Sequence, residues 1–249
     1  MQSDEQKNVW KVLKVVPENH DVNSLYIDGS NGKFSERRAG QFLSIRIPLD
    51  SGWSEPHPFT ISCAPEDPYL RLTIKKIGAF TSSIPELKPG TEVKLAGPLG
   101  GFCKDIESNS NIVMIAGGVG ITPFLSVLLH FHHANLHNDV KLFWSNKTRD
   151  DMFAVGDLNE MSKDLSLTVI HVLSREDSVA GYYDENFPDV VFESGRLTRD
   201  ILKKYGIRDT DSVYICGPPP MQEFELTELS SLGIDPSRVE RENFIWEKK

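Results

Sequence analysis

The chain has 249 residues, of which 39% are hydrophobic and 25% charged, as is ordinary for a soluble globular protein of one large or two medium domains. Its formal net charge of −9 argues against a nucleic-acid binder, because phosphate contacts need clustered lysine and arginine. No stretch approaches the roughly 18 apolar residues of a membrane helix. The polar start "MQSDEQKNVW" lacks the plan of a secretory signal, so we expect a soluble, cytoplasmic protein.

The three cysteines, Cys63, Cys103 and Cys216, lie far apart and form no CxxC pair. This spacing excludes zinc ribbons and iron–sulfur sites that are built from paired cysteines. An odd number of isolated cysteines fits a reducing compartment.

The first hundred residues have the pattern of short strands. The segments "VWKVLKVV", "SLYIDG", "QFLSIRI", "PFTIS", "LRLTIKK" and "EVKLAG" are β-branched or alternate in hydrophobicity, and Gly, Pro, Asn and Asp separate them. Short strands at near-regular spacing predict an antiparallel β-barrel or sandwich. One short helix is expected at "FTSSIPEL".

After about residue 108 strands and helices alternate. "NIVMIA" is typical of a parallel strand buried on both faces, and "PFLSVLLHFHHA" has a helical period. Further strands at "VKLFWS", "LTVIHVLS" and "SVYICG" alternate with helices at "GDLNEMSKDL", "TRDILKKYG" and "MQEFELTELSSLG", which predicts a parallel α/β sheet. The net charge is −1 over residues 1–108 and −8 over residues 109–249. We therefore predict two domains, 6–106 and 107–249, on either side of a polar stretch.

A glycine-rich turn follows the first strand of the second domain. The strand runs into Gly117, Gly118 and Gly120. Thr122 and Pro123 then suit the N-cap and the first position of a helix. Glycines let a backbone approach a diphosphate, and a helix N-terminus supplies free N–H groups. A tight turn that binds nothing is the alternative. The pattern is not a full GxGxxG fingerprint, and the next strand lacks the terminal acid that holds a ribose, so a plain dehydrogenase is disfavoured.

Two further signals lie at strand ends of the second domain. One strand ends in Cys216, Gly217 and Pro218, at the carboxyl edge where open α/β sheets bind ligands. A buried small hydrophobic residue is the alternative for a lone cysteine. Another strand ends in Ser174 and Arg175, which suit a phosphate clamp or a solvated loop.

The first domain holds the segments "HPFTIS" and "KKIGAFT". The second of these could form another anion cradle at the start of its short helix, with Lys75 or Lys76 nearby, or only a structural turn. In the second domain, His130, His133 and His137 share one helical face. No acid or cysteine stands near them in the sequence, so a solvated face is favoured over a metal site.

The order of "AGQFLSIRIP", "HPFTIS", "KKIGAFT", "AGGVGITP", "LSRE", "CGPPPM" and "ERENF" resembles the ferredoxin–NADP reductase superfamily, from about residue 7 to residue 246. In that family a β-barrel binds a flavin and an α/β domain binds a nicotinamide dinucleotide. The resemblance implies an FAD-binding barrel over 6–106 and an NAD(P)-binding domain over 107–249.

By this resemblance Phe59 lies against the flavin, Thr60 hydrogen-bonds near its N5 atom, and His57 faces the ribityl or diphosphate region. His57 replaces the family's usual arginine, as in ferric reductases and NADPH oxidases, so the "GAFT" turn and a lysine are expected to take more of the diphosphate contact. Phe244 is the candidate for the C-terminal aromatic that covers the flavin, and Trp246 is the second candidate.

The resemblance implies a flavin-dependent NAD(P)H oxidoreductase that passes a hydride from NAD(P)H to FAD and then electrons to an external acceptor. That acceptor would be ferredoxin or flavodoxin, a partner subunit, free flavin or a ferric chelate. Two alternatives are an electron-transfer subunit of a larger complex and a non-catalytic module that senses dinucleotide.

NADPH is expected over NADH because of the Ser-Arg pair, with Tyr182 or Tyr183 stacking on the adenine. The expected catalytic residues are Thr60 and Cys216, with no metal. The expected cofactor-binding residues are His57, Pro58, Phe59, Thr60, Ile74, Lys76, Gly78, Ala79, Phe80, Thr81, Gly117, Gly118, Gly120, Thr122, Pro123, Ser174, Arg175, Cys216, Gly217, Pro218 and Phe244.

Overall fold

The computed structural model describes residues 9–29 and 32–242 and divides the chain into two compact units. The first unit holds the residues up to Lys104 together with Leu125–His130, and the second holds Asp105–Phe124 and the residues from Phe131 on. The sequence-based limits of 6–106 and 107–249 stay a prediction, because these units divide one helix between them.

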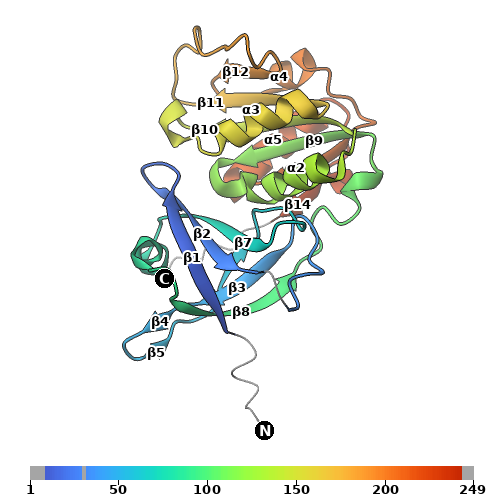
Figure 1. Ribbon diagram of the computed structural model, residues 1–249. Helices are drawn as coiled ribbons and strands as arrows, with labels where there is room; N and C mark the ends of the chain where they lie inside the picture. The colour runs from blue at the N-terminus through green and yellow to red at the C-terminus, as the bar shows by residue number, and fades with distance from the viewer. Residues whose placement is uncertain (1–8, 30–31, 243–249) are drawn as a thin grey trace. The chain divides into compact units, whose positions relative to one another are not determined.

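The first unit is built on a six-stranded antiparallel sheet, which confirms the predicted architecture (Figure 1). The strands in sheet order are β6 (His57–Thr60), β3 (Phe42–Arg46), β8 (Glu92–Leu99), β1 (Val9–Pro17), β2 (Val22–Asp28) and β7 (Tyr69–Lys75). The remaining elements of the first unit are the hairpin strands β4 (Pro48–Leu49) and β5 (Gly52–Trp53), the helix α1 (Ala79–Ser83) and the 3₁₀ turn Ile84–Glu86. The 3₁₀ turn Ile106–Ser108 already belongs to the second unit.

Alternation along the strands builds the core of the first unit. Leu70, Leu72 and Ile74 of β7 point to one face and join an apolar cluster with residues of β2, β3 and β8, as the two-residue period of a strand requires. Ile74 is only 2% exposed as a whole residue, so its expected contact with a cofactor stays a prediction. Phe59 and Phe80 are partly buried and pack against the edge of this cluster.

The second unit is a six-stranded parallel sheet, as predicted. The strands in sheet order are β12 (Val190–Ser194), β11 (Leu167–Leu173), β10 (Asp139–Asn146), β9 (Asn111–Gly117), β13 (Ser212–Cys216) and β14 (Glu240–Glu242). The helices are α2 (Thr122–Ala134), α3 (Val155–Asp164), α4 (Arg199–Lys204) and α5 (Pro219–Ser230), with 3₁₀ turns at Gly118–Ile121, Arg149–Asp151 and Pro236–Arg238.

Helices cover both faces of the parallel sheet. Leu202 of α4 and Leu229 of α5 pack with Val113 and Ile115 of β9 on one face, while α2 and α3 lie across the other (Figure 1). None of the helices within residues 9–29 and 32–242 is long and apolar enough to cross a membrane.

The strand order of this sheet creates a switch point beside β9. From β9 the chain moves outward through β10, β11 and β12, and then returns to the other side of β9 as β13. Open α/β sheets bind ligands where the strand order reverses, outside the carboxyl ends of the strands. The turns after β9 and β13 are therefore the first place to look for a ligand site.

Candidate cofactor-binding sites

In the first unit the segments "HPFT" and "GAFT" form one aromatic surface. Among the strands of the described residues, β6 lies at the edge of its sheet and pairs only with β3. The His57 ring stacks on Phe80 of α1, with centroids 3.7 Å apart and planes at 23°. The Phe59 ring lies 6.0 Å from Phe80 at 14°. Three nearly parallel rings from two separate segments thus form one stacked aromatic cluster, to which a planar ring system could add.

Thr60 ends this strand with an available hydroxyl. The residue is 6% exposed, and no side chain or backbone group within the described ranges hydrogen-bonds its hydroxyl. By contrast, Thr73 in the same unit bonds to the hydroxyls of Ser24 and Ser62, each at 2.9 Å. The Thr60 hydroxyl is not among the fully buried, unpaired side-chain atoms of the described residues, so it is accessible enough to meet a polar atom of a ligand.

A side chain of the "GAFT" turn already accepts hydrogen bonds from two backbone N–H groups at this turn. The Thr81 hydroxyl accepts the N–H groups of Ile77 at 2.8 Å and Gly78 at 3.0 Å. These two donors are therefore not free for an anion, which narrows the cradle expected from the sequence to Ala79 and Phe80. Of the two lysines considered, Lys75 is paired with Asp21 at 2.9 Å, whereas Lys76 is exposed.

In the second unit the glycine turn lies against the turn that follows β13. A Cβ atom on Gly120 would overlap the carbonyl oxygen of Cys216 and lie 2.9 Å from the Cα atom of Gly217. One on Gly117 would overlap Met221 Sδ and lie 3.0 Å from Pro218 Cδ. These glycines thus let two strand ends approach each other at the switch point.

Gly118 has a different role from its neighbours. Its φ of +53° lies in the left-handed region, and a Cβ there would have no atom within 4 Å. Left-handed backbone favours glycine, and the open space leaves room for a ligand at this peptide.

The prediction that Thr122 caps α2 is wrong. Thr122 lies inside the helix with φ −56°, and its hydroxyl donates to the Val119 carbonyl at 2.9 Å. The cause is the 3₁₀ turn Gly118–Ile121, which already has helical geometry, so the helical segment begins at the glycines. Pro123 does lie in the first turn, where its missing N–H costs nothing.

Cys216 lies at the switch point but is sealed from solvent. Its exposure is 0%, and burial, with the nearby Glu242 charge, raises the pKa of its thiol well above the ordinary value. The thiol is therefore neutral near pH 7. A contact with nicotinamide stays a prediction, and it would be made by a neutral side chain.

The loops after β10 and β11 are joined by backbone hydrogen bonds. The N–H of Ser174 donates to the Asn146 carbonyl at 2.9 Å, and that of Arg175 to the Lys147 carbonyl at 2.8 Å. Ser174 and Arg175 are both exposed. This pairing brings the cationic residues Lys147 and Arg175 to the same stretch of the carboxyl edge.

Arg149 belongs to this edge as well. Its backbone N–H donates to Glu176 at 3.1 Å, and its guanidinium lies 4.8 Å from the centroid of the Tyr182 ring. Tyr182 in turn meets Phe192 edge-on at 5.5 Å. One of the two tyrosines expected near an adenine is therefore already held between a cation and an aromatic ring.

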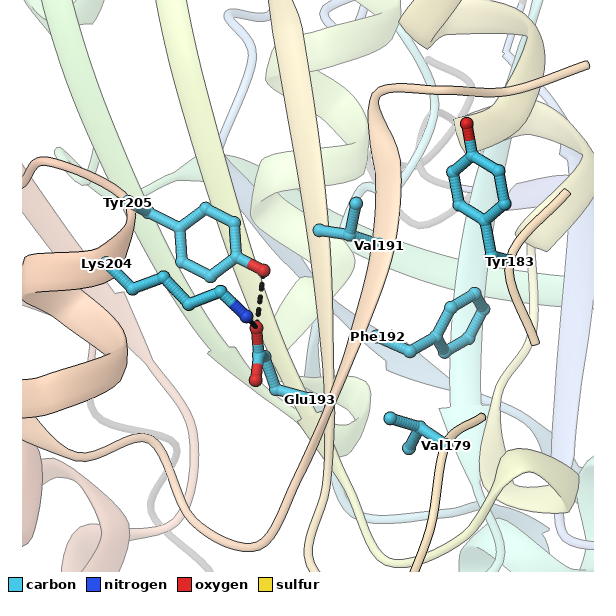
Figure 2. A pocket seen from close by; sticks show the side chains of 7 residues that line it. All are labelled: Val179, Tyr183, Val191, Phe192, Glu193, Lys204 and Tyr205. Atoms are coloured by element: carbon cyan, nitrogen blue, oxygen red, sulfur yellow. Dashed lines mark hydrogen bonds and ion pairs between the residues drawn. The ribbon is translucent and has the colours of Figure 1, made fainter. Parts of the chain in front are cut away.

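The outer strand β12 borders a cavity of about 410 Å³ (Figure 2). Figure 2 shows Glu193 on one side of the strand, where Tyr205 Oη and Lys204 Nζ each lie 2.5 Å from its Oε1 atom. Burial and the bond to Glu193 raise the pKa of Tyr205. The cavity is lined by Val179, Tyr183, Val191, Phe192, Glu193, Lys204 and Tyr205. Only Tyr183 of these was expected from sequence.

Two expected residues cannot be placed. Phe244 and Trp246 lie outside residues 9–29 and 32–242, which the structure describes. Within those ranges no group of three or more His, Cys, Asp or Glu side chains could hold a metal ion.

A buried carboxyl group on α5 predicts a pH-dependent stability. Glu225 is 2% exposed, and burial, with the nearby Glu228 charge, raises its pKa to about 8 from 4.5. Well below pH 4.5 the group is protonated in both the folded and the unfolded state. As pH rises toward 8, only the unfolded state ionises freely, so the folded state loses stability.

Glu225→Gln is expected to remove this loss and to stabilise the protein at pH 9 by on the order of a few kcal/mol, with little effect at pH 4.5. Urea unfolding at both pH values measures it. Glu223→Gln is the control, because Glu223 is an exposed acid on the same helix, paired with Arg241 at 3.1 Å. Equal effects of the two substitutions at pH 9 would contradict the prediction.

Two family models match the chain. The model of an FAD-binding domain matches residues 7–97, and the model of an oxidoreductase NAD-binding domain matches residues 114–226. Together with the antiparallel unit and the parallel unit, these matches define the class of two-domain FAD- and NAD-binding oxidoreductases. The two units together have the fold of the ferredoxin–NADP reductase superfamily, which the sequence resembles.

Curated relatives include a flavohemoprotein and the reductase component of a monooxygenase. The chain is 27% identical over 255 residues to a flavohemoprotein of Bacillus subtilis (strain 168), covering 98% of this chain and 62% of the relative. It is 29% identical over 241 residues to the reductase component of propane 2-monooxygenase from Gordonia sp. (strain TY-5), covering 94% of this chain and 66% of the relative. The chain thus spans less than two thirds of the length of these two proteins.

Solved structures show the same fold. The flavohem-like FAD/NAD binding domain of nitric oxide dioxygenase from Vibrio cholerae O1 biovar El Tor aligns with a TM-score of 0.81 at 20% identity, over 95% of this chain and 98% of that one. A ferredoxin NADP+ reductase from Neisseria gonorrhoeae, with bound FAD and NADP, aligns with a TM-score of 0.75 at 20% identity, over 94% of this chain and 97% of that one.

Proposed function

We propose that this chain is an NAD(P)H-dependent flavin reductase that delivers electrons to a separate acceptor. The observation that carries the proposal is the pair of sites described above, one in each unit. An aromatic surface ending in an available hydroxyl lies in the FAD-binding domain, and a glycine turn lies at the switch point of the NAD-binding domain. These two groups of residues support the proposal, because aromatic rings and a hydroxyl suit a flavin and a glycine turn at a switch point suits a dinucleotide.

The residues of the first unit fit a flavin. Phe59 and Phe80 would give the isoalloxazine ring or the adenosine part an apolar surface, and the Thr60 hydroxyl would bond near N5. His57 and Lys76 would stand near the diphosphate. When bound, FAD accepts a hydride from reduced nicotinamide and passes the electrons to an acceptor. The protein groups orient the ring and keep water from it.

The residues of the second unit fit a dinucleotide. The backbone around Gly118 would take the diphosphate, because its left-handed turn opens to free space and helical N–H groups follow it. Ser174 and Arg175 would bind a phosphate of the adenosine half. The cavity along β12 would take the adenine, with Tyr183 and Phe192 as its aromatic walls.

The acceptor is proposed to be a partner protein. This rests on the names of relatives: a reductase component of propane 2-monooxygenase and the gamma subunit of sulfhydrogenase 2 of Pyrococcus furiosus. An external acceptor that needs no partner, such as free flavin or a ferric chelate, is the second candidate. Turnover of ferric chelates and free flavin by the lone chain at rates typical of enzymes, on the order of 1–1,000 per second, would favour the second candidate.

The basic test is flavin binding and reduction. The purified chain is expected to be yellow, or to quench added FAD, and anaerobic NAD(P)H is expected to bleach the visible flavin band. A chain that binds no FAD would contradict the proposal. A chain that binds FAD and dinucleotide without any bleaching would instead be a sensor, which is the non-catalytic alternative.

Thr60→Val is expected to slow flavin reduction about tenfold, the value of one hydrogen bond, with a smaller effect on FAD affinity. The reason is that a bond near N5 matters most as charge develops there. Stopped-flow reduction and FAD titration measure the two effects. Thr73→Val is the control: it breaks a buried hydroxyl network and should lower stability without slowing reduction. Equal losses of rate and FAD affinity in Thr60→Val would mean that Thr60 only holds the cofactor.

A further inference from the structure

The buried indole of Trp144 is hydrogen-bonded to the glycine turn after β9. Trp144 lies on β10 next to β9 and is 0% exposed. Its Nε1–H donates to the carbonyl oxygen of Gly118 at 2.9 Å. This is a side-chain bond from the neighbouring strand to the one glycine of the turn whose surroundings are open. The motif pattern of the turn itself gives no hint of it.

The ring that makes this bond is fixed by its neighbours. Phe153 meets Trp144 edge-on, with centroids 5.1 Å apart at 82°, and His171 lies 5.6 Å away at 51°. His171 is 0% exposed, stacks on Phe192 at 4.9 Å, and has no hydrogen-bond partner for either ring nitrogen in the described part of the chain. Burial lowers its pKa to about 3, so it packs as a neutral ring.

The hydrogen bond sets the direction of one peptide. A trans peptide is planar, and its C=O and N–H point in opposite directions. Because the Gly118 carbonyl points to the buried indole, the N–H of Val119 points away from it. Val119 lies in the first turn of a helical segment, where N–H groups lack partners within the helix.

The indole adds a hydrogen bond to a carbonyl that the 3₁₀ turn Gly118–Ile121 already holds by i→i+3 bonding. A glycine at φ +53° reaches several other backbone conformations at little cost, and nothing lies within 4 Å of the position of its Cβ. Gly117 and Gly120 pack against the turn after β13 on either side of Gly118, so the direction of the peptide between Gly118 and Val119 depends on the 3₁₀ bonding and on the indole.

We propose that Trp144 is a positioning residue for dinucleotide binding: its indole N–H turns the Gly118–Val119 peptide so that the Val119 N–H faces the diphosphate. The inference rests on the proposed function, which assigns the diphosphate to this turn. Trp144 touches neither cofactor. It acts through the orientation of one backbone donor, which a rigid site supplies without reorganisation.

Trp144→Phe tests the proposal, since it keeps a buried ring and removes the N–H. The dissociation constant of NADP+, or of NAD+ if the wild type prefers it, is expected to rise about three- to tenfold, the value of one hydrogen bond. A fragment without a diphosphate, 2′-AMP for NADP+ or adenosine for NAD+, is expected to bind unchanged. In stopped-flow reduction the half-saturating concentration rises by the same factor, while the limiting rate stays unchanged.

Phe153→Leu is the matched control, because Phe153 packs on the same indole and makes no bond to the turn. It should lower the melting temperature with the dinucleotide affinity unchanged. Equal losses of dinucleotide affinity in the two variants, an unchanged affinity in Trp144→Phe, or an equal loss for the fragment would each overturn the proposal. A wild-type chain that binds no dinucleotide would overturn the proposed function instead.

If Trp144→Phe does not fold, hydrogen exchange of the indole proton in the wild-type protein tests the same proposal. Trp10 and Trp53 are only partly buried, so the slowest-exchanging indole proton of the described part belongs to Trp144. Saturating dinucleotide is expected to slow this exchange further, because a ligand that needs the closed turn suppresses its opening. The diphosphate-free fragment should leave the rate as it is. Equal slowing by both ligands, or none by the dinucleotide, would overturn the proposal.

Discussion

Gly120→Ala is expected to abolish efficient use of NAD(P)H while the first unit keeps its FAD. The new methyl group would overlap the carbonyl oxygen of Cys216 and lie 2.7 Å from its carbonyl carbon. Both are backbone atoms of β13, which cannot rotate away, so the ends of β9 and β13 must separate. Overpacking of this kind costs about 1–3 kcal/mol. A misplacement of about 1 Å at a reacting site can lower the rate a hundredfold, and we expect kcat/KM for NAD(P)H to fall by about that factor.

Substitutions at two other glycines distinguish the effect of steric overlap from that of backbone strain. Gly118→Ala meets no atom within 4 Å but must adopt φ +53°, which costs about 1–2 kcal/mol of strain. Gly156→Ala in α3 meets neither obstacle and is expected to stabilise the chain by up to about 1 kcal/mol. FAD content, kcat/KM and thermal unfolding are measured for all three. If Gly120→Ala keeps the wild-type kcat/KM, the close approach of the two turns is irrelevant to dinucleotide binding.

The glycine turn shows what a local pattern can predict. The apolar run of β9, the glycines and the helical period of α2 stand in one stretch of sequence, so strand, turn and helix were expected together. The capping role of Thr122 was wrong because a 3₁₀ turn at Gly118–Ile121 differs from a loop only in its backbone angles. Sequence patterns do not fix those angles for glycine.

Long-range pairings could not be predicted in the same way. "HPFT" and "GAFT" were each expected near a flavin, but the stacking of His57 on Phe80 depends on how β6 and α1 come together. The bond from Trp144 to Gly118 likewise depends on β10 being the neighbour of β9, which a list of strands does not specify.

The sequence analysis did not predict the cavity along β12 because it did not predict β12 itself. β12 has five residues at the edge of the sheet, and β14 consists of "ERE". Short edge strands carry little hydrophobic alternation, since one side faces water. Without β12, the sequence analysis could not place Glu193 next to Tyr205, and the cavity that both residues line gave no signal in the sequence.

NADPH is expected to be preferred over NADH, and Arg175 is expected to read the difference. The 2′-phosphate that distinguishes the two carries close to two negative charges, and residues 109–249 have a net charge of −8, so local cations must offset the repulsion. The bonds between the loops after β10 and β11 bring Lys147 and Arg175 together. Glu193, the acid in the nearby cavity, is already paired with Lys204.

Arg175→Ala is therefore expected to lower kcat/KM for NADPH and to change that for NADH little. A charge-assisted hydrogen bond contributes about 1.5–3 kcal/mol, which corresponds to about ten- to a hundredfold in preference.

Arg238→Ala is the control, because it removes one positive charge from the same unit at a residue that bonds to the Asp209 carbonyl. Both dinucleotides are compared in the wild type and in the two variants. A wild type that prefers NADH, or equal losses for both dinucleotides in Arg175→Ala, would show that Arg175 does not read the 2′-phosphate. Equal effects of the two substitutions would show that only the net charge of the domain matters.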